Sequence, residues 1–107
     1  ATRNGDPIEW EALAQVWGDA LGDLRVSSTK ALHGHLLGAA GALEAAITVL
    51  ALHRRALPPN MNVSAPDPDC ALNLVDVQDT AAPSLEAAVS SSFAFGGTNA
   101  ALAFTRA

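Results

Sequence analysis

Two side chains that can stabilise negative charge lie five positions apart, Lys30 and His35. Both can donate a proton or a hydrogen bond to an oxyanion that develops during a reaction. Small residues follow at positions 38–42, where a helical pattern begins. Glycine inside a helix costs roughly 1 kcal/mol relative to alanine, so Gly38 and Gly41 indicate that another backbone or a ligand approaches closely. The stretch 27–44 is therefore the candidate functional site.

A helix is expected before this stretch. Asp6 is typical of an N-cap residue, Pro7 of the first helical position, and Glu9 is spaced for a capping box. Apolar residues then recur at helical spacing, and a glycine at position 18 or 22 ends the helix. Residues 24–28 form a short candidate strand that leads into the site.

A second helix, residues 38–55, follows the site. Most of its circumference is apolar, and Pro58 and Pro59 end the pattern. A helix that is hydrophobic nearly all round is usually buried in a larger structure. A chain of 107 residues can hardly bury such a helix on all sides by itself.

The remaining chain predicts short strands. A loop rich in Pro, Asn and Asp, residues 60–71, precedes a strand at 72–77. Two apolar runs, 87–95 and 99–104, flank Gly96-Gly97, which predicts an antiparallel hairpin with a Gly-Gly turn. Both faces of these runs are apolar, which again indicates burial.

Composition narrows the class of protein. The length fits one domain. A net charge of −5 and scattered basic residues argue against nucleic acid, whose partners carry a clustered basic surface. No stretch approaches the roughly 20 apolar residues of a membrane span. A single cysteine excludes an internal disulfide, which fits a reducing compartment. We therefore expect a cytoplasmic protein.

Several separated motifs resemble one family, the β-ketoacyl-acyl-carrier-protein synthases, the condensing enzymes of fatty-acid and polyketide synthesis. The central motif is Ser-Ser-Thr-Lys30, then Gly34-His35-Leu-Leu-Gly-Ala-Ala-Gly41, with Glu44 on the helix. Further matching stretches are Gly5–Glu9, Leu57–Pro59, Asp67–Val75 and Ser92–Asn99. The resemblance spans nearly the whole chain but only about the last quarter of a family member.

The resemblance implies a thiolase-like α/β fold of five layers, α-β-α-β-α, in which residues 1–107 are the last part of the C-terminal half. Family members join an acyl group, held on a nucleophilic cysteine, to malonyl-carrier protein, whose decarboxylation supplies the attacking carbanion. The implied partners are an acyl carrier protein with phosphopantetheine-bound acyl and malonyl groups, and the N-terminal portion that carries the cysteine and a first histidine. A homodimer is the usual assembly. No cofactor and no metal are implied.

The resemblance also assigns roles to residues. His35 matches the second catalytic histidine, whose imidazole N–H stabilises the enolate oxygen. Lys30 matches the catalytic-site lysine, and Glu44 matches the carboxylate that holds it, because a buried ammonium without its partner costs several kcal/mol. Without the motif, a structural loop histidine and a solvated surface lysine are the simpler interpretations.

Two further segments match binding elements of the family. Phe95-Gly96-Gly97 matches a gate in which the Phe95 N–H contributes to an oxyanion hole and the ring swings between steps. Thr2 matches a threonine that hydrogen-bonds the pantetheine arm. The chain departs from the family at Ala94, usually glycine, and at Ser91, usually asparagine, which affects the expected acyl-chain preference more than the mechanism.

Three other reactive side chains have simpler expected roles. His33 stands where the family usually has threonine or another small residue, and loop packing is its expected role. His53 is expected to be a cation at a helix C-terminus. Cys70 lies in a Pro/Asp loop without the base or helix N-terminus that lowers a thiol pKa, so it is not the nucleophile.

Two alternatives stay open. One is a non-catalytic partner subunit, like the chain-length factors that form heterodimers with ketosynthases; these tend to lose catalytic residues, whereas Lys30 and His35 are present. The other is a stand-alone module that holds a phosphate or pantetheine at the glycine-rich helix start. Such a module is expected to be a folded monomer, whereas a segment of a larger enzyme is expected to aggregate through its apolar helix and hairpin.

Overall fold

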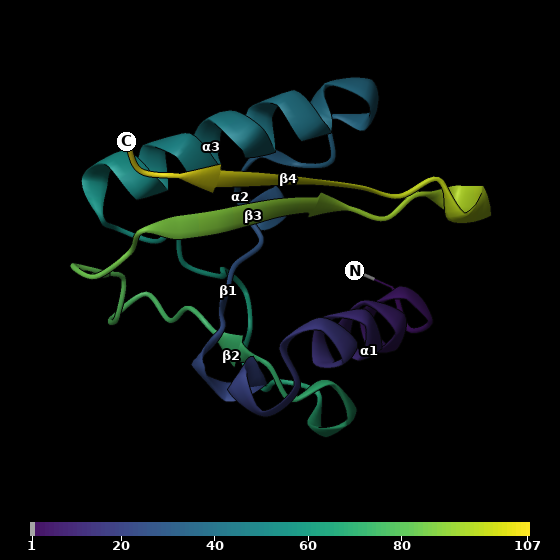
Figure 1. Ribbon diagram of the computed structural model, residues 1–107. Helices are drawn as coiled ribbons and strands as arrows, with labels where there is room; N and C mark the ends of the chain where they lie inside the picture. The colour runs from purple at the N-terminus through teal and green to yellow at the C-terminus, as the bar shows by residue number, and fades with distance from the viewer. Residues whose placement is uncertain (1) are drawn as a thin grey trace.

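A computed structural model describes residues 2–107 of the chain. Three α-helices, four short 3₁₀ helices and four strands follow one another within the described residues (Figure 1). In chain order they are α1 (Gly5–Trp17), η1 (Gly18–Asp23), β1 (Arg25–Val26), α2 (Lys30–His33), η2 (Leu37–Ala39), α3 (Ala40–Arg54), η3 (Pro68–Cys70), β2 (Asn73–Leu74), β3 (Ala87–Ser92), η4 (Phe95–Gly97) and β4 (Ala100–Thr105).

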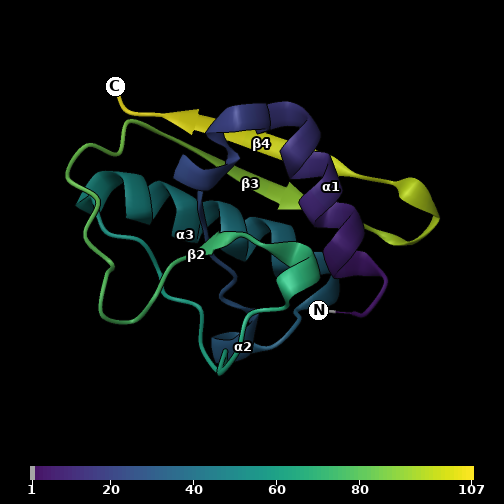
Figure 2. The same ribbon diagram turned by 90° about the horizontal axis from the view of Figure 1, so that it is seen from below.

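The elements form two groups. Helix α3 packs along the hairpin of β3 and β4, while α1 packs with the short elements η1 and η3 beside β1 and β2 (Figures 1 and 2). The chain passes from the second group to the first through β1 and α2. The candidate site therefore lies on the connection between the two groups.

Two small sheets match the strands expected from the sequence, with shorter bounds. β1 pairs in parallel with β2, with Val26 opposite Leu74. β3 pairs antiparallel with β4, from Ala87 opposite Thr105 to Ser92 opposite Ala100. The mixed content of helix and strand agrees with the α/β expectation, and the five-layer arrangement stays a prediction.

The expected tight Gly-Gly turn of the hairpin is wrong, because pairing stops at Ser92 and resumes at Ala100. The connection contains the 3₁₀ turn η4, in which Gly96 and Gly97 have φ angles of 76° and 77°. L-residues with side chains rarely adopt such angles, so the two glycines are needed for this loop. The Asn99 side chain closes it, since its Oδ1 accepts a hydrogen bond from the Ala94 N–H at 3.2 Å.

The expected start of the first helix is also wrong in detail. Helix α1 begins at Gly5, and Asn4, not Asp6, is its N-cap residue. Thr2 and Asp6 exchange bonds instead: Asp6 Oδ1 accepts from the Thr2 N–H at 3.1 Å, and the Asp6 N–H donates to the Thr2 carbonyl at 3.1 Å. Thr2 Oγ1 also accepts from the Gly5 N–H at 2.8 Å. The helix ends at Gly18, with a φ angle of 52°, as the sequence predicts.

The end of α3 is fixed to the hairpin by Arg106. Its guanidinium donates to the Leu52 carbonyl at 2.7 Å, and its backbone N–H donates to the Glu86 carbonyl at 3.0 Å. Glu86 also forms an ion pair with Arg55, at 2.8 Å, just past the helix. These bonds satisfy carbonyl groups that a helix C-terminus leaves unpaired.

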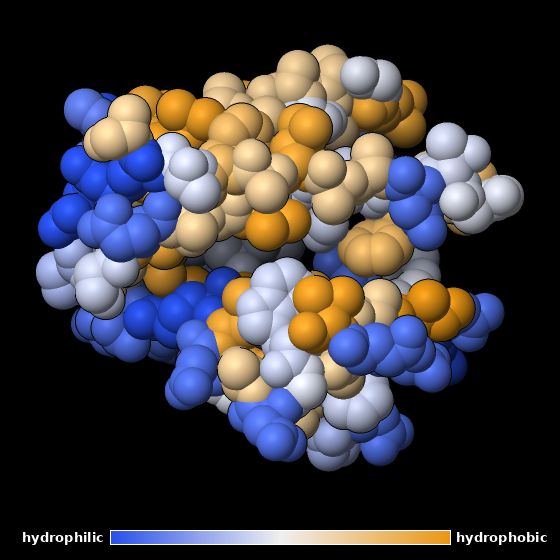
Figure 3. Space-filling model, in the orientation of Figure 1, coloured by the Kyte–Doolittle hydropathy of each residue, from blue (hydrophilic) through white to orange (hydrophobic). Residues whose placement is uncertain are grey.

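The hydrophobic core is small. The buried apolar residues are Ala40, Ala51, Leu52 and Val75. Large apolar side chains remain exposed on α3 and on the hairpin, among them Val49, Leu50, Val89 and Leu102. Apolar atoms accordingly gather over α3 and the hairpin in the upper part of Figure 3. The face expected to be buried is uncovered in this chain.

The segment Leu37–Arg54 consists of helix α3 and the turn before it. Judged by length and hydropathy alone, it could cross a membrane. From the sequence, no stretch was expected to approach the apolar length of a membrane span, and this segment contradicts that expectation in length and hydropathy. A core helix of a soluble protein passes the same two measures, so length and hydropathy alone do not assign α3 to a membrane.

Leucines two positions apart on α3 test where the core lies. Leu52 is 4% exposed and Leu50 is 49% exposed. Leu52→Ala is expected to lower the free energy of unfolding by about 2–5 kcal/mol, because it leaves a cavity. The control Leu50→Ala is expected to change it by less than about 0.5 kcal/mol. Urea denaturation of both variants measures the difference, and equal losses contradict this core.

Candidate functional site

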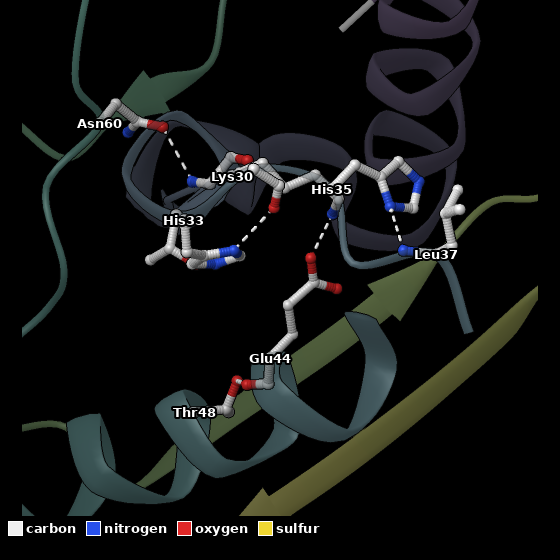
Figure 4. A network of polar contacts seen from close by, with 10 residues as sticks. Lys30, His33, His35, Leu37, Glu44, Thr48 and Asn60 are labelled. Carbon is white, nitrogen blue, oxygen red and sulfur yellow. Dashed lines mark hydrogen bonds and ion pairs between the residues drawn. The ribbon is translucent and has the colours of Figure 1, made fainter. Parts of the chain in front are cut away.

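Side-chain hydrogen bonds fix the loop that leads from β1 into the site. Ser27 Oγ donates to the Pro58 carbonyl. Asn60 Oδ1 accepts from the Ser28 N–H at 2.8 Å, and Asn60 Nδ2 donates to the Val26 carbonyl at 2.9 Å (Figure 4). The strand end is thereby tied to the segment that follows α3. Sequence analysis missed Asn60, whose only signal was its place directly after two prolines.

Lys30 and Glu44 form an ion pair between α2 and α3. Glu44 reaches from the first turns of α3 toward the loop that carries Lys30 and His35 (Figure 4). The side chain of Glu44 is 14% exposed and that of Lys30 is 37% exposed. The structure therefore brings together the two residues that the motif pairs, and the ammonium group is kept partly open to solvent.

The imidazole of His35 has a defined tautomer. Its Nδ1 accepts a hydrogen bond from the Leu37 backbone N–H at 3.0 Å (Figure 4). A nitrogen that accepts carries no hydrogen, so the neutral ring has its hydrogen on Nε2. His35 is exposed, and its Nε2–H is available as a donor.

The donor to His35 comes from a strained residue. Leu37 has a φ angle of 50°, in the left-handed region that side-chain-bearing residues seldom adopt. Such a conformation costs on the order of 1–3 kcal/mol and persists only where the surroundings impose it. The same residue donates its backbone N–H to the imidazole of His35.

His33 is bonded on both ring nitrogens, whereas the sequence predicts only loop packing. Nε2 lies 2.9 Å from Thr29 Oγ1, and Nδ1 lies 2.7 Å from the Gly34 carbonyl oxygen. The rings of His33 and His35 point in different directions from the loop (Figure 4).

Within residues 2–107, no hydrogen bond or ion pair joins the other two predicted elements to the side chains of Lys30 and His35. The Phe95 ring, in the Phe95-Gly96-Gly97 turn, is fully exposed at the tip of the hairpin. The Thr2 hydroxyl already accepts from the Gly5 N–H before α1. Its own hydrogen stays free to donate.

Gly38, before α3, and Gly41, in its first turn, meet little of this chain. A Cβ at Gly38 would meet no atom within 4 Å, and one at Gly41 would lie 4.0 Å from Ser92 Oγ. The close approach predicted from these glycines is therefore not made by the backbone of the described residues.

The pKa values of two side chains, Glu9 and Cys70, are raised above their usual values. Burial raises the pKa of the Glu9 carboxyl, the Asp6 carboxylate raises it further, and Lys30 opposes the shift. Glu9 thus belongs to the electrostatic surroundings of the Lys30–Glu44 pair, a placement that sequence analysis missed. Desolvation and the Asp67 carboxylate raise the pKa of the Cys70 thiol, so it is not activated.

No group of three or more His, Cys, Asp or Glu side chains suited to a metal ion occurs within residues 2–107. The site contains an ammonium group and an imidazole N–H, two groups that can interact favourably with an anion.

A family model described as the C-terminal domain of β-ketoacyl synthases matches residues 1–64. The chain belongs to the β-ketoacyl synthase family. It is 42% identical over 106 residues to 3-oxoacyl-[acyl-carrier-protein] synthase 2 of Coxiella burnetii, covering 99% of this chain and 25% of that protein. The Lys30–Glu44 pair and His35 thus lie in a chain of the family whose motif they match.

Other synthases and related proteins match to the same extent. Nodulation protein E of Rhizobium meliloti is 42% identical over 103 residues, covering 96% of this chain and 25% of that protein. The mitochondrial 3-oxoacyl-[acyl-carrier-protein] synthase of Arabidopsis thaliana is 42% identical over 106 residues, covering 97% of this chain and 23% of that protein. The chain therefore spans about a quarter of the length of these relatives.

The raised pKa of Glu9 predicts a pH-dependent stability. The folded state binds the proton more tightly than the unfolded state, so this contribution is fully present below pH 4.5 and is lost as the pH rises through the folded pKa. Glu9→Gln, which stays neutral, is expected to unfold at a higher temperature than the wild type at pH 7. Melting curves at pH 4 and pH 7 measure it, and a lower melting temperature of the variant at pH 7 contradicts it.

Proposed function

We propose that residues 1–107 are the C-terminal part of a β-ketoacyl synthase and supply one half of its active site. Together with an N-terminal portion, the chain catalyses decarboxylative condensation of an acyl thioester with malonyl-carrier protein to a 3-oxoacyl-carrier protein, in fatty-acid or polyketide synthesis. The observation that carries the proposal is the tautomer of His35, which leaves an exposed Nε2–H donor five residues along the chain from the Lys30 ammonium group that Glu44 holds.

In the proposed reaction, His35 stabilises charge on the malonyl thioester. Loss of carbon dioxide moves an electron pair onto the thioester, and the carbonyl oxygen becomes an enolate oxygen. A fixed N–H donor at that oxygen lowers the barrier, since it interacts more strongly with the enolate than with the neutral carbonyl. The Leu37 N–H holds Nδ1, so the ring is oriented before the substrate binds. The enolate carbon then attacks the acyl thioester on the cysteine of the N-terminal portion. The new carbon–carbon bond forms as the acyl C–S bond breaks, and the cysteine leaves as a thiolate.

Lys30 supplies positive potential to the same step. Glu44 fixes the position of its ammonium group from α3, and the partial burial of the pair strengthens its field relative to bulk water. The lysine acts through charge and position, and the two histidines of the complete site provide the donors.

The remaining parts of the proposal concern binding and assembly. Phe95-Gly96-Gly97 serves as the gate at the acyl pocket, and the freedom of its two glycines supports such a motion. Thr2 donates its hydroxyl hydrogen to the pantetheine arm of an acyl carrier protein. The N-terminal portion covers α3 and the hairpin in a five-layer thiolase-like fold, which forms a cytoplasmic homodimer. The exposed apolar side chains on both elements support this cover.

His35 is tested in an assembled enzyme, a chimera in which this chain replaces the matching last quarter of the Coxiella burnetii relative. His35→Ala is expected to lower malonyl decarboxylation by about 10²- to 10³-fold, because an oxyanion donor is lost. The control His53→Ala changes an exposed histidine at the end of α3 and is expected to leave the rate unchanged. Carbon dioxide release from malonyl-carrier protein measures both.

Three outcomes decide between the functions. A wild-type chimera that decarboxylates and loses the activity with His35→Ala supports the proposal. A natural companion chain without a reactive cysteine, found by intact mass and iodoacetamide labelling of material that copurifies with this chain, favours the chain-length-factor-like partner. A folded monomer without a companion overturns the catalytic assignment.

Glu44 provides a second test in the same chimera. Glu44→Gln keeps the shape of the side chain but removes the charge that holds Lys30, so kcat is expected to fall by about 10- to 100-fold. Glu11→Gln makes the same chemical change on the exposed surface of α1 and serves as the control. Equal rates for the two variants contradict a role for the ion pair.

A further inference from the structure

His33 lies in the candidate site, but the proposed mechanism does not use it. It ends the one-turn helix α2 and is half-buried, and both of its ring nitrogens have partners. Nε2 lies 2.9 Å from the Thr29 hydroxyl and Nδ1 lies 2.7 Å from the Gly34 carbonyl oxygen. A side chain that only fills a loop does not need two polar contacts at these distances.

The direction of one bond is fixed by its acceptor. A carbonyl oxygen only accepts, so Nδ1 of His33 carries a hydrogen and donates to Gly34. In the neutral ring, Nε2 then accepts from the Thr29 hydroxyl. Thr29 is only 8% exposed, so water is a poor substitute for this partner. The hydrogen on Nδ1 is opposite to the arrangement in His35, where Nδ1 accepts.

The two partners of His33 stand next to the two residues of the site. Thr29 directly precedes Lys30, and Gly34 directly precedes His35. Gly34 has a φ angle of 76° and a ψ angle of 178°, which only glycine adopts freely, so its carbonyl can be turned toward the ring. A bond to that carbonyl sets the peptide plane that leads into His35.

We propose that His33 is a positioning residue of the site. Its imidazole clamps Thr29 to Gly34 and thereby fixes the placement of His35 relative to Lys30. The inference rests on the proposed function, because the placement matters only if both residues act on one substrate. The backbone bond from the Gly34 N–H to the Lys30 carbonyl, at 2.8 Å, holds the turn itself, and the imidazole sets the orientation of the peptide after it.

Both ends of the clamp are tested in the chimera described above. His33→Ala removes both bonds, and Thr29→Val removes the hydroxyl with little change of shape. Each is expected to lower the kcat of condensation by about 5- to 30-fold, the effect of one misplaced hydrogen bond, with KM for the carrier protein within about twofold of wild type. The double variant is expected to be no slower than the slower single variant, because both remove the same interaction.

A conservative variant and a matched control separate positioning from stability. His33→Asn keeps an N–H donor near the place of Nδ1 and is expected to recover part of the kcat lost in His33→Ala. His53→Ala serves again as the histidine control. Melting temperatures are measured for all variants, and a stabilising role alone lowers the melting temperature without the split between kcat and KM.

The possible outcomes are distinguishable. A wild-type chimera that does not condense overturns the proposed function and this inference with it. An active wild type with unchanged kcat in His33→Ala and Thr29→Val overturns the inference alone. If the variants do not fold, ¹⁵N NMR of labelled histidine in the wild type decides: a hydrogen on Nδ1 of His33 and on Nε2 of His35 supports the clamp, and the reverse arrangement at His33 overturns it.

Discussion

The ion pair between Lys30 and Glu44 is the contact on which the site depends. It joins the loop after β1 to the helix that follows the site, across a stretch in which the chain reverses direction. Partly exposed ion pairs contribute only about 0–1 kcal/mol to stability, so the pair matters mainly for geometry. With Glu44 held on the rigid helix α3, the position of the ammonium group follows from the packing of α3 against the hairpin.

His35 is positioned by backbone groups, whereas Lys30 is positioned by an ion pair. The loop has two residues with positive φ angles close to this histidine, Gly34 before it and Leu37 after it. The first permits the turn out of α2, and the N–H of the second donates to Nδ1 of the ring. A backbone conformation such as that of Leu37 persists where the fold over-determines the chain. The bond from its N–H places the hydrogen of the neutral ring on Nε2.

The sequence predicts the elements of this chain better than their ends. The apolar period of α3 and the two runs of the hairpin indicate elements that the structure contains. The cap at Asp6 and the Gly-Gly turn were wrong because both depend on side-chain bonds, from Thr2 and from Asn99, that compete with the expected motif.

Some residues of the candidate site could likewise be predicted from the sequence, and others could not. The family resemblance points to Lys30, His35 and Glu44 and implies the Lys30–Glu44 ion pair, which the structure contains. The partners of His33 could not be predicted because they depend on its rotamer. Those of Asn60 could not be predicted because they lie far away in the sequence. Family resemblance gives no signal for His33 either, because the residue departs from the usual one at that position.

Arg106 has a practical consequence for anyone who expresses this segment. Its side chain closes the C-terminus of α3 at Leu52, and its backbone N–H extends the hairpin to Glu86. A cloning boundary drawn after Thr105 would therefore unpair both elements at once, although it removes only two residues of this sequence. An affinity tag placed directly after Arg106 would crowd the same junction, so a flexible spacer or an N-terminal tag suits this segment better.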